Sequence, residues 1–206
     1  DRLDAALAVL PRGARADTVL GDFASLASLR AMADTVRARG LVLDVLVNNA
    51  GVYMNDARLT IDGFEMTFGV NHLAPFLLTH LLLPALSPTH ARVINVSSVA
   101  HGRGRLDPRT WRSLDGFSPY GAYAQSKLAN YHFALGLQRE FARAGVAATS
   151  LLAHPGLSHS DLQTRTVREG GAGWSGPFWA WLARHTGTDV ADGARPQIRA
   201  ATDPDA

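Results

Sequence analysis

The chain has 206 residues, of which 47% are hydrophobic and 18% charged, and its formal net charge is +2. This length suits one α/β domain with a single core, and the composition is ordinary for a globular protein. The small charge and the lack of a basic stripe with interleaved aromatic residues argue against nucleic acid as a partner. The chain has no cysteine, which excludes disulfides, thiolate zinc sites and cysteine nucleophiles, and we predict no metal site.

We expect a cytoplasmic protein without membrane contact. The longest apolar run, residues 72–86, is interrupted by two prolines, a threonine and a histidine. It falls short of the roughly 20 apolar residues that a spanning helix needs. The first residues, 1–4, show no signal-peptide pattern.

Helical and strand-like patterns alternate from the start of the chain. Residues 4–10 have a helical pattern, and a short apolar run at 18–21 is the first predicted strand. Ser25 can cap a helix whose apolar residues follow helical spacing, and Gly40 ends this helix.

Three further strands are predicted from apolar runs at 45–47, 92–96 and 147–153. Long helical patterns lie between them, over 64–83 and over 123–141.

The last part of the chain has two helical patterns, over 178–184 and 189–201. Alternation of strands and helices predicts an α/β fold, a Rossmann-like doubly wound parallel sheet with helices on both faces. We find no repeat, linker or low-complexity tract, so we expect a single domain over residues 1–206.

Tyr123 and Lys127 are four residues apart in a predicted helix, so their side chains share a face. A tyrosine titrates near pH 10 in water, and a neighbouring cation favours its phenolate by about 1.4 kcal/mol per pKa unit. A phenol tuned in this way can exchange a proton with a carbonyl or alcohol oxygen while hydride moves.

The alternative is an ordinary surface pair one helical turn apart. However, Lys127 is the only lysine of the chain, and there are four tyrosines. A lone lysine falls four residues after a tyrosine by chance only about 2% of the time, which favours a functional pair.

Small polar motifs follow the predicted strands, where ligands of parallel sheets bind. Residues 48–51 (Asn-Asn-Ala-Gly) would let a cofactor approach the backbone, although a plain turn is the alternative. Ser98, in the motif 95–98, can donate to a substrate oxygen or simply cap a helix. The motif 154–156 (His-Pro-Gly) could wall a nicotinamide pocket or only end a strand, and His154 itself favours a structural role.

Together these motifs resemble the short-chain dehydrogenase/reductase family. The sequence around these motifs, notably residues 71–79 and 126–130, is similar to the retinol dehydrogenase and WW-domain oxidoreductase-like branch of this family. The resemblance extends from about residue 17 to the end of the chain.

The resemblance implies a role for each matching residue. Tyr123 is then the acid/base, and Lys127 lowers its pKa and binds the nicotinamide ribose. Ser98 orients the substrate oxygen, and Asn71 holds a water that links Lys127 to solvent. Tyr123 and Lys127 are also implied to contact the cofactor. The further cofactor contacts implied are Asp22 at the adenine, Asn49, Ala50 and Gly51 on the adenosine side, and Pro155, Gly156, Ser158 and Ser160 at the nicotinamide. The family usually has threonine where Ser160 stands.

The sequence also departs from the family. The first β-α-β segment, with its glycine-rich pyrophosphate loop, and the last strand are both lacking from the sequence as given. A literal G-x-G-x-x-G occurs at 171–176, but it follows polar residues and not a buried strand, so we reject it as a cofactor loop. We expect a fragment of a longer gene product with an open sheet edge, and we favour NADP over NAD from the branch resembled.

Aromatic residues are concentrated in 173–184, a region that covers the substrate in the family. They predict an apolar alcohol or carbonyl substrate, with core packing, an oligomer interface or membrane contact as alternatives. Two other functions stay open: an inactive fragment or binding module without dinucleotide binding, and an epimerase or dehydratase. Enzymes of the latter kind generally lack the motif at 48–51 in this form and have a larger substrate domain.

Overall fold

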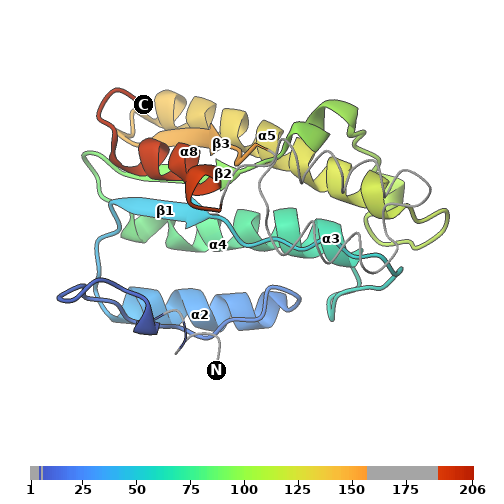
Figure 1. Ribbon diagram of the computed structural model, residues 1–206, viewed down its shortest axis with the longest axis horizontal. Helices are drawn as coiled ribbons and strands as arrows, with labels where there is room; N and C mark the ends of the chain where they lie inside the picture. Colours follow the sequence, from blue (N-terminus) through green and yellow to red (C-terminus); the bar gives the residue numbers. More distant parts are fainter. Residues whose placement is uncertain (1–4, 6, 157–189) are drawn as a thin grey trace.

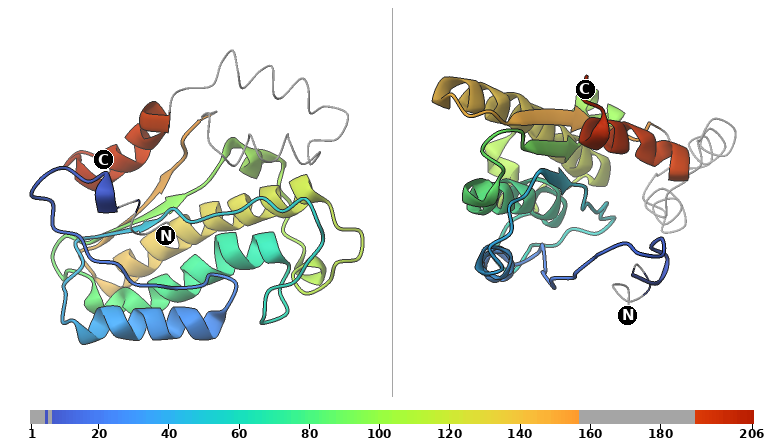
Figure 2. Two further views of the ribbon diagram at one scale, coloured as in Figure 1. Left: turned by 60° about the horizontal axis from the view of Figure 1, so that its bottom comes forward. Right: turned by 90° about the vertical axis from the view of Figure 1, so that its left-hand side faces the viewer.

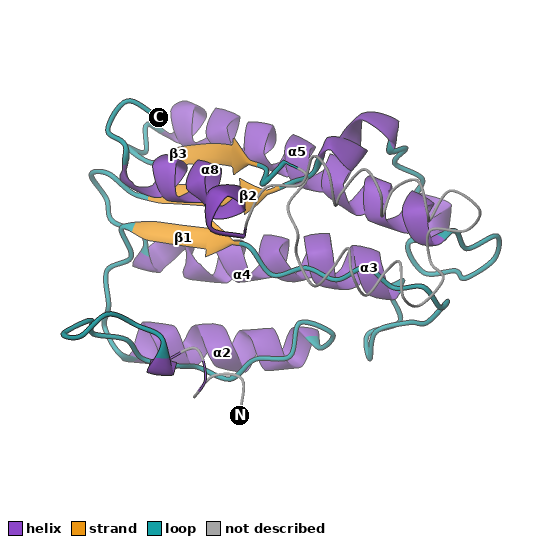
Figure 3. Ribbon diagram, viewed as in Figure 1, coloured by secondary structure: helices purple, strands orange, loops and turns teal. Residues whose placement is uncertain are grey.

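A computed structural model describes residue 5, residues 7–156 and residues 190–206 (Figure 1). In these residues three parallel strands form one sheet, in the order β1 (Val45–Asn48), β2 (Arg92–Val96) and β3 (Thr149–Ala153) (Figure 3). The parallel arrangement brings the three carboxyl ends to the same edge. The predicted parallel α/β fold is confirmed.

Helices cover both faces of this sheet. Their bounds are α2 (Leu26–Ala38), α3 (Met66–Phe68), the π-helical turn η1 (Gly69–Leu73), α4 (Ala74–Leu82), the 3-10 turns η2 (Leu83–Ala85), η3 (Val99–Arg103) and η4 (Pro108–Thr110), α5 (Pro119–Ala144) and α8 (Val190–Thr202). Helices α4 and α5 lie on one face of the sheet and α8 on the other, while α2 packs against α4 (Figure 2). The alternation of side chains agrees, since Val93 packs toward α5 and Ile94 toward α8.

Local sequence signals explain where the main helices begin and end. The Ser25 hydroxyl accepts a hydrogen bond from the Ser28 amide at 3.2 Å and caps α2, as predicted. Ser118 caps α5 in the same way, and Pro119 occupies its first position. Gly145 ends α5 with a φ of 66°, a left-handed conformation that favours glycine.

The predicted strand at 18–21 is wrong. These residues have no regular structure, and Leu20 is 84% exposed. A strand needs a hydrogen-bonded neighbour, and no described strand pairs with this segment. The helical pattern at 4–10 is confirmed only at the described residues 5, 7 and 8, and the pattern at 178–184 lies outside the described residues.

The segment Met66–Ala85 is one nearly continuous apolar helical run of 20 residues with a mean hydropathy of 1.3. It is long and apolar enough to cross a membrane, contrary to the expectation from the sequence. However, 56% of it is buried in the fold, between α2 and α5. A core helix of a soluble protein has the same properties.

Candidate active site

The carboxyl ends of β1 and β2 are joined by buried amide side chains. Asn48 and Asn95 are register partners, and Asn48 Nδ2 donates to Asn95 Oδ1 and to Thr79 Oγ1, each at 2.9 Å. These contacts link both strands to helix α4. They hold the start of the loop 49–51 at the edge of the sheet.

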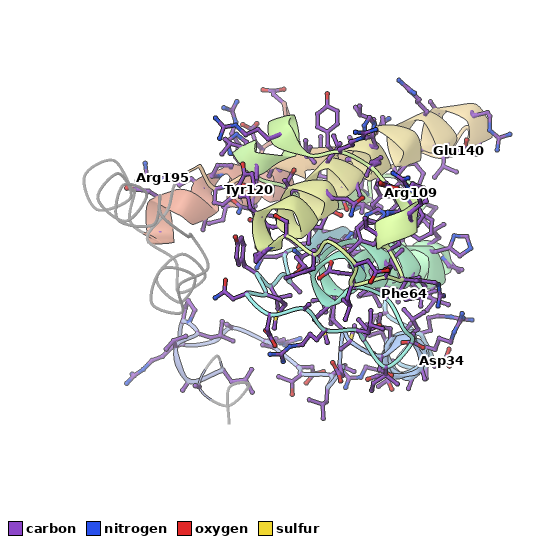
Figure 4. The ribbon with its side chains drawn as sticks, turned by 90° about the vertical axis from the view of Figure 1, so that its right-hand side faces the viewer. Asp34, Phe64, Arg109, Tyr120, Glu140 and Arg195 are labelled. Carbon is purple, nitrogen blue, oxygen red and sulfur yellow. The ribbon has the colours of Figure 1, made fainter. Side chains whose placement is uncertain are left out.

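Tyr123 and Lys127 lie on the same face of α5, as predicted. The Nζ atom of Lys127 is 5.6 Å from the centroid of the Tyr123 ring. Figure 4 shows Tyr120 near the start of α5 and Glu140 toward its other end, so the pair belongs to the half of the helix that begins at Tyr120. Nζ also donates to the main-chain oxygen of Val96 at 3.1 Å, which ties the ammonium to the end of β2.

Lys127 is only 5% exposed, although it carries a charged group. Burial lowers its pKa to about 8. No described carboxylate forms an ion pair with it, so among the described residues no negative charge offsets the loss of water. A lysine with such a pKa can gain or lose a proton near neutral pH.

The expectation that Lys127 lowers the pKa of Tyr123 stays a prediction, because other groups decide the direction of the shift in this structure. Burial raises the pKa of the Tyr123 phenol, and Tyr120 adds to the rise, while a side-chain hydrogen bond with Ser98 lowers it. Burial removes water from Tyr123 and from Lys127 alike, and it is the largest cause of both shifts. Tyr123 is therefore a protonated phenol at neutral pH.

Asn71 is fully buried in the π-helical turn η1, and its side chain fixes the loop after Gly51. Its Oδ1 accepts from the Val52 amide at 2.7 Å, and its Nδ2 donates to the Val52 oxygen at 2.9 Å and to Ser126 Oγ at 3.0 Å. A Cβ on Gly51 would lie 3.3 Å from Asn71 Oδ1 and 3.6 Å from Lys127 Nζ. The loop, Asn71 and Lys127 thus meet at one point.

Ser98 lies at the start of η3 and faces Tyr123. Its Oγ accepts from the Ala100 amide at 3.3 Å and takes part in the side-chain hydrogen bond with Tyr123. Its main-chain oxygen bonds to His101 Nδ1 at 2.6 Å, and the His101 ring stacks on Tyr131 of α5. The four predicted catalytic residues are therefore brought together, and their catalytic roles stay predictions.

The predicted cofactor residues are placed as follows. Asn49, Ala50 and Gly51 form an exposed strip after β1. Pro155 and Gly156 follow β3 and line, with residues of α8, an open cavity of about 600 Å³. Ser158 and Ser160 lie outside the described residues.

Asp22 is exposed just before α2, and its Oδ1 accepts from the Ala24 amide at 2.9 Å. This bond stabilises the turn that leads into the helix. Its adenine contact stays a prediction.

Sequence reasoning missed three residues of the site. The Tyr53 ring lies 5.3 Å from the Tyr123 ring, and burial raises the pKa of the Tyr53 phenol as well. The Ser126 hydroxyl donates to the Tyr123 main-chain oxygen at 2.7 Å. Asn130 also contacts the site, and its spacing three residues after Lys127 was the available signal.

The lowered pKa of Lys127 predicts how stability depends on pH. Between about pH 8 and its ordinary value of 10.5, the unfolded chain binds a proton that the folded chain has lost. The free energy of unfolding should then rise with pH in this window, by at most about 1.4 kcal/mol per pH unit. Urea unfolding of the full-length protein and of Lys127→Met at several pH values measures the difference in slope. Equal slopes would contradict the assigned pKa.

The family model for short chain dehydrogenases matches residues 1–169, and the chain belongs to this family. Polyprenol dehydrogenase of Mus musculus is 45% identical over 170 residues, which are 78% of this chain and 49% of that protein. Retinol dehydrogenase 11 of Homo sapiens is 45% identical over 145 residues, 68% of this chain and 44% of that protein. These relatives confirm the retinol dehydrogenase branch. The chain spans about half the length of the curated relatives it matches.

A solved short chain dehydrogenase from Burkholderia cenocepacia, in complex with NADP, has a similar fold. The TM-score is 0.64 and the sequence identity 26%, over 92% of this chain and 70% of that one. This likeness agrees with the parallel sheet and with the helices on its two faces.

Proposed function

We propose that the full-length protein is an NAD(P)-dependent oxidoreductase that interconverts an alcohol and a carbonyl compound. The observation that carries the proposal is the buried pair of Tyr123 and Lys127, with Ser98 and Asn71 beside it, at the carboxyl edge of a parallel sheet. Ligands of parallel sheets bind at this edge, so the groups that exchange protons lie where a ligand would bind. Membership of the short-chain dehydrogenase family supports the same activity.

The residues present fit a nicotinamide dinucleotide. Lys127 has three N–H donors, of which one goes to the Val96 oxygen, and no described residue accepts the other two. They suit the vicinal hydroxyls of a ribose. The exposed strip 49–51 has small side chains that allow a ligand to approach the backbone, and Gly51 lies next to Nζ. We favour NADP, the cofactor in the solved relative from Burkholderia cenocepacia.

The bound nicotinamide would supply or accept the hydride. In the reductive direction, the substrate oxygen would accept hydrogen bonds from Ser98 and Tyr123, and the Tyr123 proton would pass to it as the carbon receives the hydride. The raised pKa of Tyr123 keeps the phenol protonated, which is the state that this donation needs. The ammonium of Lys127 would then stabilise the phenolate that remains.

We also propose that the substrate is apolar. The half-buried Tyr53 ring beside Tyr123 offers an apolar surface next to the reacting oxygen. The aromatic residues of 173–184 support the same class, although they lie outside the described residues. The oxygen of such a small-molecule alcohol or aldehyde would make the polar contacts, and its partners would be Ser98 and Tyr123.

The proposal is tested by cofactor binding and turnover. Titration of the full-length protein with NADPH and with NADH, followed by nucleotide fluorescence, should show saturable binding. The same titration of the 206-residue chain decides whether this part binds alone. A panel of aliphatic and aromatic aldehydes with both cofactors then identifies the substrate class. Absence of binding and turnover in the full-length protein would refute the proposal.

A further inference from the structure

Asn130 of α5 connects three elements of the site. It is 4% exposed, and its Nδ2 donates to the main-chain oxygen of Asn71 at 2.9 Å. The same nitrogen is 3.5 Å from the main-chain oxygen of Val96. Its Oδ1 lies 3.0 Å from Nδ1 of His72. One side-chain amide thus joins α5, the end of β2 and the turn η1.

The Asn71 carbonyl lacks the donor that an α-helix would give it. In an α-helix the carbonyl of residue 71 would accept from the amide of residue 75. Residue 75 is Pro75, which has no N–H. The chain here forms the π-helical turn Gly69–Leu73, in which the Ala74 amide reaches back to the Gly69 oxygen. Asn130 therefore bonds a carbonyl that the proline leaves without its helical partner.

The Asn71 carbonyl fixes which way round the Asn130 amide lies, and His72 holds the other end of the amide. Nδ2 can point toward Asn71 only if Oδ1 points toward His72, and Oδ1 then accepts from a protonated Nδ1. The His72 ring is held between Phe68 and Phe76, at centroid distances of 5.2 and 6.0 Å. Burial lowers the pKa of His72, so the ring is neutral at neutral pH and this bond selects its tautomer.

Asn130 also shares an acceptor with Lys127. The two residues are three apart on α5, and both direct a nitrogen at the Val96 oxygen, at 3.1 Å from Nζ and 3.5 Å from Nδ2. The carbonyl that anchors the ammonium is thus also approached by the amide. A change at Asn130, which is 4% exposed, therefore alters the surroundings of Nζ from within the fold.

We propose that Asn130 is a positioning residue of the proton-transfer site, which supplies the hydrogen bond that Pro75 cannot give to Asn71 and is held at its side-chain oxygen by His72. The proposal rests on the proposed function for its effect on turnover. Its structural part, the coupling of Asn130 to the Lys127 ammonium, stands independently of that function.

The first test is steady-state kinetics of the full-length protein, with substrate and cofactor concentrations varied in turn. Asn130→Leu keeps the volume and removes the amide, and should lower kcat about tenfold with KM for the cofactor within about twofold. His72→Phe keeps an aromatic ring among Phe68 and Phe76 but loses Nδ1, and should lower kcat by less. The double variant should be no slower than Asn130→Leu, because both changes disrupt one chain of bonds. Additive losses in the double variant would overturn the role of His72.

The matched control is Gln138→Leu. Gln138 is on the same helix, and its amide oxygen accepts from the Ser150 amide of β3 at 2.7 Å. The Gln138→Leu variant thus loses a hydrogen bond between α5 and β3 that involves none of the residues of the proton-transfer site. Its kcat should stay within about twofold of the unaltered protein, even if its stability falls by about 1 kcal/mol. A tenfold loss here as well would reduce Asn130 to a structural role and overturn the proposal.

The second test does not require turnover. Lys127 is the only lysine of these 206 residues, so its ammonium can be followed by NMR after labelling with ¹⁵N-lysine. Loss of the signal in Lys127→Arg assigns it. Tyr123 is the titratable group that faces Nζ, and His72 acts on the Lys127 ammonium through Asn130. Removal of the amide leaves the Val96 carbonyl more negative, so Asn130→Leu should raise the pKa of Lys127 by about half a unit.

The two tests separate the proposals. An unchanged Lys127 pKa in a folded Asn130→Leu protein overturns the positioning role. Should Asn130→Leu not fold, His72→Phe carries the same measurement, with a smaller rise expected and no change counting against the proposal. If the full-length protein neither binds nucleotide nor turns over substrate, the proposed function fails, and the Lys127 titration still decides the role of Asn130.

Discussion

Tyr123→Phe in the full-length protein should lower kcat by about 100- to 10,000-fold, the range that general acid–base groups contribute. The variant lacks only the hydroxyl, and its ring still packs beside Tyr53. Cofactor affinity should stay nearly the same, because Lys127 and the loop 49–51 are untouched. Steady-state kinetics with the best aldehyde of the panel, together with NADPH fluorescence titration, measure both quantities.

Tyr120→Phe is the matched control for this variant. Tyr120 lies one turn earlier on the same helix and is exposed to solvent (Figure 4). Loss of its hydroxyl should change kcat by no more than about twofold. A Tyr123→Phe protein that is folded but no longer binds NADPH would contradict the assigned role, since the hydroxyl would then serve binding and not proton transfer.

Lys127→Arg should lower kcat/KM by about 100-fold, although it keeps the positive charge. The guanidinium is longer and wider than the ammonium, and it would have to fit where the Lys127 side chain is only 5% exposed. Arginine also cannot lose its proton, whereas burial lowers the lysine pKa to about 8. Kinetics over a range of pH, and chemical denaturation to confirm the fold, measure the effect.

The reciprocal exchange Arg103→Lys serves as its control. Arg103 is exposed in the turn η3, close in sequence to Ser98, and no described salt bridge involves it. Activity should be unchanged there. Full activity of Lys127→Arg would show that a permanent charge is sufficient, and it would remove the case for a titrating lysine.

The placing of Tyr123 and Lys127 could be predicted from the sequence because it depends on helix geometry alone. Residues four apart share a face wherever the helix lies. The strands at 45–47 and 92–96 were equally accessible, since apolar runs of this length are buried in parallel sheets. The start of α5 was missed by four residues because Ser118 and Pro119 are cap signals and carry no apolar periodicity.

The direction of the Tyr123 pKa could not be predicted in this way. The direction depends on how much water the fold removes from the phenol and on which groups lie near it. Both are set by tertiary contacts. The role of Asn130 was hidden for a similar reason. Its partners are Asn71 and His72, almost sixty residues away in the chain, and only the packed fold brings them together.

The amide pair between Asn48 and Asn95 has a consequence for how the chain finds its pairing during folding. The two side chains bond only when these residues are direct neighbours across β1 and β2. A shift of one residue would set Asn48 beside an apolar partner, Ile94 or Val96, and leave a buried amide without its bond, at a cost of about 1–3 kcal/mol. The pair thus selects one alignment of the two strands. Since the Val96 carbonyl anchors Lys127, the alignment of the strands also helps to set the position of the ammonium relative to the Tyr123 ring.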